Sequence, residues 1–174
     1  MSFLVDICVD SLESATIAEA SGAGRIELCS ALSEGGVTPS AGLIEAVRNN
    51  ISIDVYVIIR PRGGDFLYTD HDFSVMRRDI ERAGEAGAEG IVTGILNRDG
   101  TVDVERTALL AEYAAPMQVT FHRAFDLCRE PKRALEDIIS AGASRILTSG
   151  QARTAIEGAP VIKDLIATAG GRII

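Results

Sequence analysis

One short motif recurs along the chain and constrains its fold more than any other feature. Gly22-Ala23-Gly24-Arg25-Ile26 is matched by Gly142-Ala143-Ser144-Arg145-Ile146 and, more loosely, by Gly87-Ala88-Glu89-Gly90-Ile91. The leading glycine of each copy suits the left-handed position that ends a helix, because glycine has no Cβ to clash there. The residues that follow open an apolar run. The motif therefore predicts the same joint from a helix to a strand at three points of the chain.

Short β-branched runs alternate with amphipathic segments throughout the sequence. Apolar residues spaced by three and four predict helices at Phe73-Met76-Ile80-Ala83-Gly87 and at Ile156-Ala159-Ile162-Leu165-Ala169. Strands separated by single helices indicate right-handed βαβ units and a parallel sheet. We expect strands at residues 4–8, 25–29, 53–60, 90–93, 117–122 and 145–148, with a seventh beginning at 172–174.

This recurring joint favours an α/β fold of the TIM-type (β/α) barrel class over an open doubly wound sheet. No G-x-G-x-x-G follows the first strand, so we expect no nucleotide cofactor. The 174 residues suit one domain, but a complete eight-unit barrel takes roughly 250. We therefore expect residues 1–174 to form a single, incomplete barrel domain. It would hold about six βα units plus the start of a seventh strand and lack the last two units.

Charge and hydropathy exclude several kinds of partner. The net charge of −8 argues against nucleic acid and against anionic membrane surfaces, because phosphate binding needs a basic surface. The longest apolar runs, such as residues 55–59, are far shorter than the ~20 residues that span a bilayer. The first residues do not resemble a signal peptide, and three cysteines without an export signal are expected to be reduced thiols. We expect a cytoplasmic protein.

The predicted strands carry polar residues on the face that should line the barrel interior. Successive side chains of a strand point to opposite faces, so Asp6 lies on the other face from its apolar neighbours in the first strand. Glu27, Arg60 and His122 lie on the corresponding face of later strands. A barrel interior built for stability alone would carry Val, Ile and Leu. Because buried charges cost free energy unless they pair or bind a ligand, these residues indicate a site. An internal salt-bridge network without a ligand is the alternative.

Two cysteines follow the same inward alternation. Cys8 and Cys29 end the first two strands, and neighbouring parallel strands lie under about 5 Å apart, so their thiols could approach each other. Two soft sulfurs suit Cu(I). The alternative is that both are small buried hydrophobic residues. Cys128, in the loop after the fifth strand, is either a third ligand or a plain loop residue.

Two loops have the composition of small-anion sites. Arginine offers paired donors to an oxyanion, and glycine lets backbone N–H groups approach it. Alternatively, the arginines pair with nearby aspartates, and the second loop is a turn with a helix cap. The residues in question are Arg60, Arg62, Gly63 and Gly64 after the third strand, and Thr148 and Ser149 after the sixth.

His122 ends the fifth strand and is one of only two histidines. At the mouth of a barrel it could act as an acid/base catalyst with Glu27 as its partner. A purely structural histidine is the alternative.

Several ordered blocks resemble the CutC family. They are Cys8-Val9-Asp10-Ser11, Arg25-Ile26-Glu27-Leu28-Cys29-Ser30, Glu34-Gly35-Gly36, Thr38-Pro39-Ser40, Ile59-Arg60-Pro61-Arg62-Gly63-Gly64-Asp65-Phe66, Val119-Thr120-Phe121-His122-Arg123-Ala124-Phe125-Asp126 and Leu147-Thr148-Ser149-Gly150. The resemblance implies a TIM-type barrel that serves copper homeostasis in the cytoplasm as a homo-oligomer. It also implies copper ligands at Cys8 and Cys29. Gly24 stands where the family mostly has Asp, and the resemblance does not include the family's last quarter.

Two functions follow as hypotheses. One is a copper(I)-binding homeostasis protein that uses Cys8 and Cys29. The other is an enzyme that acts on a small metabolite with a phosphate or carboxylate group. In the second, Arg60 and Arg62 would hold the anion, and His122 and Glu27 would exchange protons with the substrate.

Overall fold

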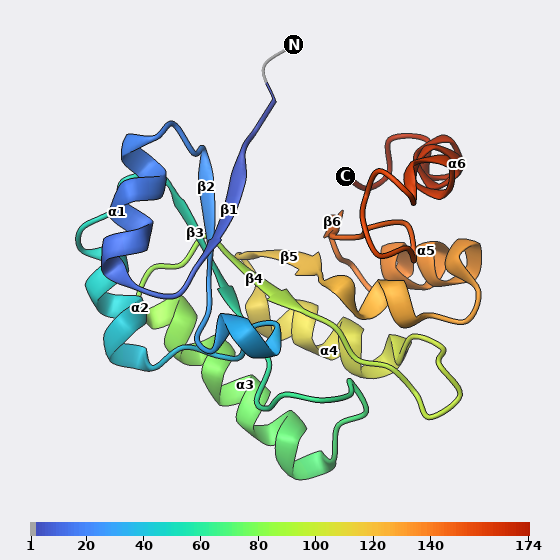
Figure 1. The fold of residues 1–174 in the computed structure, drawn as a ribbon. Helices are drawn as coiled ribbons and strands as arrows, with labels where there is room; N and C mark the ends of the chain where they lie inside the picture. Colours follow the sequence, from blue (N-terminus) through green and yellow to red (C-terminus); the bar gives the residue numbers. More distant parts are fainter. Residues whose placement is uncertain (1–2) are drawn as a thin grey trace. The chain divides into compact units, whose positions relative to one another are not determined.

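A computed structural model describes residues 3–174 of the chain, which fall into two compact units. The first takes in the chain up to Gly64 together with Asp70–Val92. The second consists of Asp65–Thr69 and Thr93–Ile174. Figure 1 colours both along the sequence.

The first unit is built on four strands that pair in sequence order, all parallel. Helices separate these strands, as the spacing of apolar residues predicts, and α1, α2 and α3 follow one another beside them (Figure 1). The elements are β1 (Asp6–Val9), α1 (Leu12–Ala20), β2 (Arg25–Leu28), the short 3-10 helix η1 (Leu32–Glu34), α2 (Ala41–Arg48), β3 (Asp54–Ile58), α3 (Asp70–Glu85) and β4 (Gly90–Thr93).

The second unit continues the alternation, with β5 parallel to β6. Its elements are α4 (Val104–Ala114), β5 (Gln118–Phe121), the 3-10 helix η2 (Arg123–Leu127), α5 (Pro131–Ser140), β6 (Arg145–Ile146) and α6 (Ala159–Ala169). The backbone N–H of Ile174 donates to the Ser144 carbonyl at 3.2 Å, and Ile146 N–H donates to the Ile174 carbonyl at 2.9 Å. This is the bonding pattern of a parallel ladder, so the predicted start of a seventh strand is confirmed.

The joints that the repeated motif predicts are present in the structure. Gly22, Gly87 and Gly142 have φ values of 90°, 85° and 88°, and each follows the end of a helix and precedes a strand. Positive φ costs glycine nothing, whereas a Cβ would be strained there. The parallel strands and intervening helices confirm the predicted α/β class.

One predicted helix begins later than expected. Ile156 shares the apolar spacing of α6 but is 89% exposed, because the helix starts only at Ala159. Pro160 stands in the first turn, where its fixed φ and missing N–H are best tolerated. No helix among residues 3–174 combines the length and the apolar character needed to cross a lipid bilayer.

Both faces of β2 are buried, and they differ in chemistry as the alternation predicts. Ile26 and Leu28 are fully buried on one face, and Arg25 and Glu27 are buried on the other. The first unit therefore has an apolar core and a polar interior on opposite sides of its sheet.

Helix α3 is attached through one apolar stripe, so its core residues should dominate the stability of the first unit. Ile80 is fully buried, and replacing it by alanine is expected to lower the free energy of unfolding by about 2–5 kcal/mol. Val75 on the same helix is 48% exposed, and Val75→Ala should change it by no more than about 0.5 kcal/mol. Urea denaturation of both variants tests this, and equal losses would contradict the assignment of the buried face.

Candidate functional site

The structure brings together the two cysteines that the sequence singles out. Cys8 lies in β1, Cys29 directly follows β2, and their sulfur atoms are 3.8 Å apart. Cys29 is 0% exposed, whereas Cys8 is open to solvent. A reagent or ion in solution therefore reaches the pair from the side of Cys8.

The register of the two strands favours free thiols over a disulfide. Cys8 pairs with Glu27, and Cys29 lies two residues beyond Glu27, directly after β2. On ideal strand spacing this diagonal separates the two Cα atoms by roughly 8 Å. A disulfide needs Cα atoms within about 7 Å, so closing one would require the backbone to move.

The two thiols differ in acidity because they share a hydrogen bond. That bond is the main cause that raises the pKa of Cys8, and burial and the negative charges of Cys29, Glu27 and Asp6 raise it further. The pKa of Cys29 is lowered, because a bond from Cys8 stabilises its thiolate, although burial, Asp10 and Glu27 oppose this. The first proton therefore leaves Cys29, and the second stays on Cys8 unless a cation replaces it.

Gly36 packs closely against Cys29. A Cβ at this position would lie 3.2 Å from the Cys29 Cβ and 3.4 Å from its sulfur, and the φ of +83° also disfavours any side chain. Tyr56, Ile58 and Val92 pack with Cys29 in a buried cluster. The sulfur is thus held in one place by neighbours with little freedom.

Part of the polar interior forms an ion pair. The Arg25 guanidinium donates from Nε at 2.8 Å and from Nη2 at 2.5 Å to one oxygen of Asp6. Its Cζ atom also lies 4.4 Å from the centre of the Tyr56 ring, a cation–π contact. A salt bridge inside the first unit, which was the alternative to a ligand site, therefore exists beside the cysteine pair.

Arg60 is buried, with its donors directed at carbonyl groups. Nη1 donates at 2.9 Å to the carbonyls of Glu34 and Gly36, and Nη2 donates at 2.9 Å to that of Gly64. The predicted anion loop thus forms around a guanidinium that binds backbone oxygens.

Arg62, its predicted partner in the anion site, is more exposed. It donates to the Gly63 carbonyl at 3.1 Å, and its Nε lies 3.6 Å from Asp72.

His122 belongs to the second unit, whereas Glu27, its predicted partner, belongs to the first. The Nδ1 atom of His122 accepts a hydrogen bond from the Ala124 backbone at 3.2 Å, which places the proton of a neutral ring on Nε2. The ring lies 4.8 Å from that of Phe66, and the residue is buried. These contacts fix the orientation of the imidazole.

The predicted second anion loop binds an anion from within the protein, which the sequence did not reveal. The Asp126 carboxylate accepts hydrogen bonds from the Thr148 hydroxyl at 2.5 Å, the Ser149 N–H at 3.1 Å and the Gln151 N–H at 3.1 Å. Arg123 Nε donates to it at 2.8 Å. Only the run of small polar residues at 148–150 hinted at such a nest of donors.

Cys128 also lies in the second unit, where its buried thiol donates to the Ala124 carbonyl at 3.7 Å. Burial is the main cause that raises its pKa to about 12, and Asp126 and Asp137 add to the effect. Within residues 3–174 no cluster of three or more His, Cys, Asp or Glu side chains is arranged to hold a metal ion.

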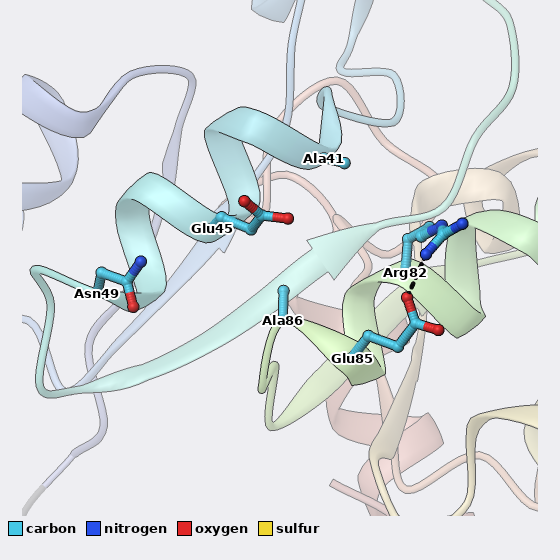
Figure 2. Close-up of a pocket in the computed structure, with 6 residues that line it drawn as sticks. All are labelled: Ala41, Glu45, Asn49, Arg82, Glu85 and Ala86. Atoms are coloured by element: carbon cyan, nitrogen blue, oxygen red, sulfur yellow. Dashed lines mark hydrogen bonds and ion pairs between the residues drawn. The ribbon is translucent and has the colours of Figure 1, made fainter.

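A groove of about 420 Å³ lies between α2 and α3 (Figure 2), and none of the residues that line it is a predicted site residue. Its charged residues are Glu45, Arg82 and Glu85, with small Ala41 and Ala86 beside them. Arg82 and Glu85 form an exposed ion pair at 2.5 Å, so the groove is a solvated part of the helix layer.

Asp126 should make the stability of the second unit depend on pH. Burial alone would raise its pKa, but the bonds from Thr148, Arg123, Gln151 and Ser149 outweigh this and lower it below the ordinary value of 3.8. Its contribution is therefore complete above about pH 4 and is lost as the pH falls through the folded-state pKa.

The variant Asp126→Asn tests this contribution. At pH 7 the free energy of unfolding of the variant should be about 1–3 kcal/mol lower than that of the native protein. This difference should shrink below about pH 4. Asp164→Asn, which removes an exposed ion pair with Lys132, should cost no more than about 1 kcal/mol. Denaturant titrations at several pH values measure both, and a gap that is independent of pH would contradict the assignment.

Comparisons with known proteins agree with the blocks noted in the sequence. The CutC family model matches residues 3–174. The copper homeostasis protein cutC homolog of Mus musculus is 52% identical over 172 residues, which cover 99% of this chain and 63% of that protein. A family protein CutC of Chromobacterium violaceum is 52% identical over 173 residues, covering 99% of this chain and 70% of its own length. This chain thus spans less than two thirds of its mouse relative.

Solved structures give the same assignment of fold. The CutC protein of Streptococcus agalactiae matches with a TM-score of 0.94 and 34% identity, over 99% of this chain and 85% of that one. An aldolase matches with a TM-score of 0.71 at 18% identity, over 97% of this chain and 76% of that one, and shows the fold alone. The predicted class, a TIM-type (β/α) barrel with six strands and the start of a seventh, is confirmed. The chain belongs to the CutC family.

Proposed function

We propose that this chain is a cytoplasmic copper homeostasis protein that binds Cu(I) through Cys8 and Cys29. The observation that carries the proposal is the 3.8 Å separation of the two sulfur atoms. Metal–thiolate bonds of about 2.3 Å allow one ion to bridge sulfurs up to about 4.6 Å apart, so a single ion can reach both.

The chemistry of the pair favours Cu(I) over other cations. Thiolates are soft ligands, and Cu(I) accepts low coordination numbers. Structural zinc takes four protein ligands, and no third candidate ligand joins this pair within residues 3–174. A cation would also replace the proton that Cys8 retains beside the Cys29 thiolate.

The relatives support the copper role, since those of mouse and human are named copper homeostasis protein cutC homolog. The family resemblance further supports a homo-oligomer as the functional state. Because the chain spans 63% of either relative, the activity of the full-length proteins comes to it only as part of this proposal.

The contacts of the arginines favour copper over the enzyme hypothesis. An anion clamp needs donors directed at the substrate, whereas Arg60 directs three hydrogen bonds at backbone carbonyls. A substrate phosphate or carboxylate would have to displace these bonds, each of which is strengthened by the charge of the guanidinium.

Cu(I) titration against a competing chromophoric chelator tests the proposal. Cys8→Ser and Cys29→Ser should each weaken binding at least tenfold, or about 1.4 kcal/mol, because serine is a poor ligand for a soft ion. Cys128→Ser is the matched control and should bind as the native protein does. Affinity should also fall on acidification, because protons compete for the thiolates. A double Cys8→Ser, Cys29→Ser variant with native affinity would rule the site out.

A further inference from the structure

We propose that Arg60 is a positioning residue of the cysteine pair, because it pins residues 30–38 over Cys29. These residues connect β2 to α2 and are called the strap below. The inference rests on the proposed function, since it concerns access of an ion to Cys29. The protection of the Cys29 thiol by the strap can be tested without copper.

The strap has little regular structure of its own. Its only helical turn is η1, and its ends meet in an isolated antiparallel bridge between Ser30 and Val37. Ala31, Gly35 and Gly36 all have positive φ, at 51°, 84° and 83°. The left-handed conformation strains Ala31, and holding the two glycines in one shape costs conformational entropy. The strap therefore needs bonds from outside to keep this shape.

Arg60 supplies these bonds with both its side chain and its backbone. The side chain donates to the Glu34 and Gly36 carbonyls, each at 2.9 Å. The backbone N–H of Arg60 donates to the Thr38 hydroxyl at 2.9 Å, and Thr38 N–H donates to the Arg60 carbonyl at 2.9 Å. Four bonds of 2.9 Å thus join one residue to three points of the strap.

The pinned strap lies directly against the buried thiol. Gly36 accepts from Arg60 through its carbonyl, and its Cα packs so closely that a Cβ would come within 3.4 Å of the Cys29 sulfur. Arg60 is itself 5% exposed, so solvent does not compete for its donors. The order of contact is therefore Arg60 to Gly36 to Cys29.

The planar fork of the guanidinium explains why arginine occupies this position. Nη1 reaches two carbonyls of the strap while Nη2 reaches the Gly64 carbonyl in the loop after β3. A lysine ammonium lacks this fixed fork and would not span the same acceptors. Arg60→Lys should therefore release the strap in part while it retains the charge.

Site-resolved thiol labelling tests the proposal. In a Cys8→Ser background, Cys29 and Cys128 remain, and both are buried. N-ethylmaleimide labelling followed by peptide mass spectrometry gives the rate at each thiol. Arg60→Ala should raise the rate at Cys29 at least about tenfold, through loss of the bonds that hold the strap. The rate at Cys128 should remain within about twofold, because that thiol reports on general unfolding.

Arg48→Ala is the matched control within the same unit. Arg48 also donates to backbone carbonyls, those of Ile51 and Ile53, and it pairs with Glu89 at 3.0 Å. The carbonyls that Arg48 binds lie in the segment before β3, whereas Arg60 lies after that strand and binds the strap. Arg48→Ala should therefore destabilise the unit without selective labelling of Cys29.

Three outcomes would overturn the inference. They are a native rate at Cys29 in Arg60→Ala, an equal rise at Cys29 in Arg48→Ala, and a native rate at Cys29 in Arg60→Lys. The lysine variant decides the matter if Arg60→Ala labels both thiols equally because it fails to fold.

The same experiments separate this inference from the proposed function. A native protein that does not bind Cu(I) would contradict the proposed function and leave the labelling result unchanged. If Cys29 in Arg60→Ala is labelled at the native rate while the native protein binds Cu(I), only the role of Arg60 is contradicted.

Discussion

The register between β1 and β2 is the constraint on which the site depends. Asp6 pairs with Arg25 and Cys8 with Glu27, so one face of this strand pair carries two acids, a base and a thiol. A shift of β2 by one residue would exchange its two buried faces, so that Arg25 and Glu27 would enter the apolar core and Ile26 and Leu28 would take their places. Burial of those two side chains therefore holds the cysteines in position, although neither side chain belongs to the site.

Two arginines of this protein organise backbone. The buried Arg60 binds the carbonyls of two loops, and the part-buried Arg48 binds those of Ile51 and Ile53 in addition to its ion pair with Glu89. Carbonyls of irregular segments would otherwise lose their hydrogen bonds to water on burial. A guanidinium has five donors and stays charged, so a single residue can satisfy several such groups.

The sequence predicted the features that follow from local rules. Glycine-marked joints, strand alternation and the apolar stripe of α3 depend on neighbours in the chain, and they gave the class of fold and the inward cysteines. The partners of Arg60 could not be predicted, because the carbonyl of Glu34 lies 26 residues away and carries no side-chain signature. Asp126 was missed for a related reason. The donors around it were recognised as suited to an anion, but nothing local showed that the anion comes from η2.

The position of the cysteine pair in the sheet links an ion to the pairing of strands. Cys8 lies on β1, while Cys29 directly follows β2, the strand that pairs with β1. An ion held by both sulfurs binds only while these two strands are paired. Its binding free energy is therefore added to the cost of separating β1 from β2. The amide hydrogens of β1 would then exchange more slowly with solvent in the loaded protein, whereas those of β5 and β6 in the second unit would exchange as before.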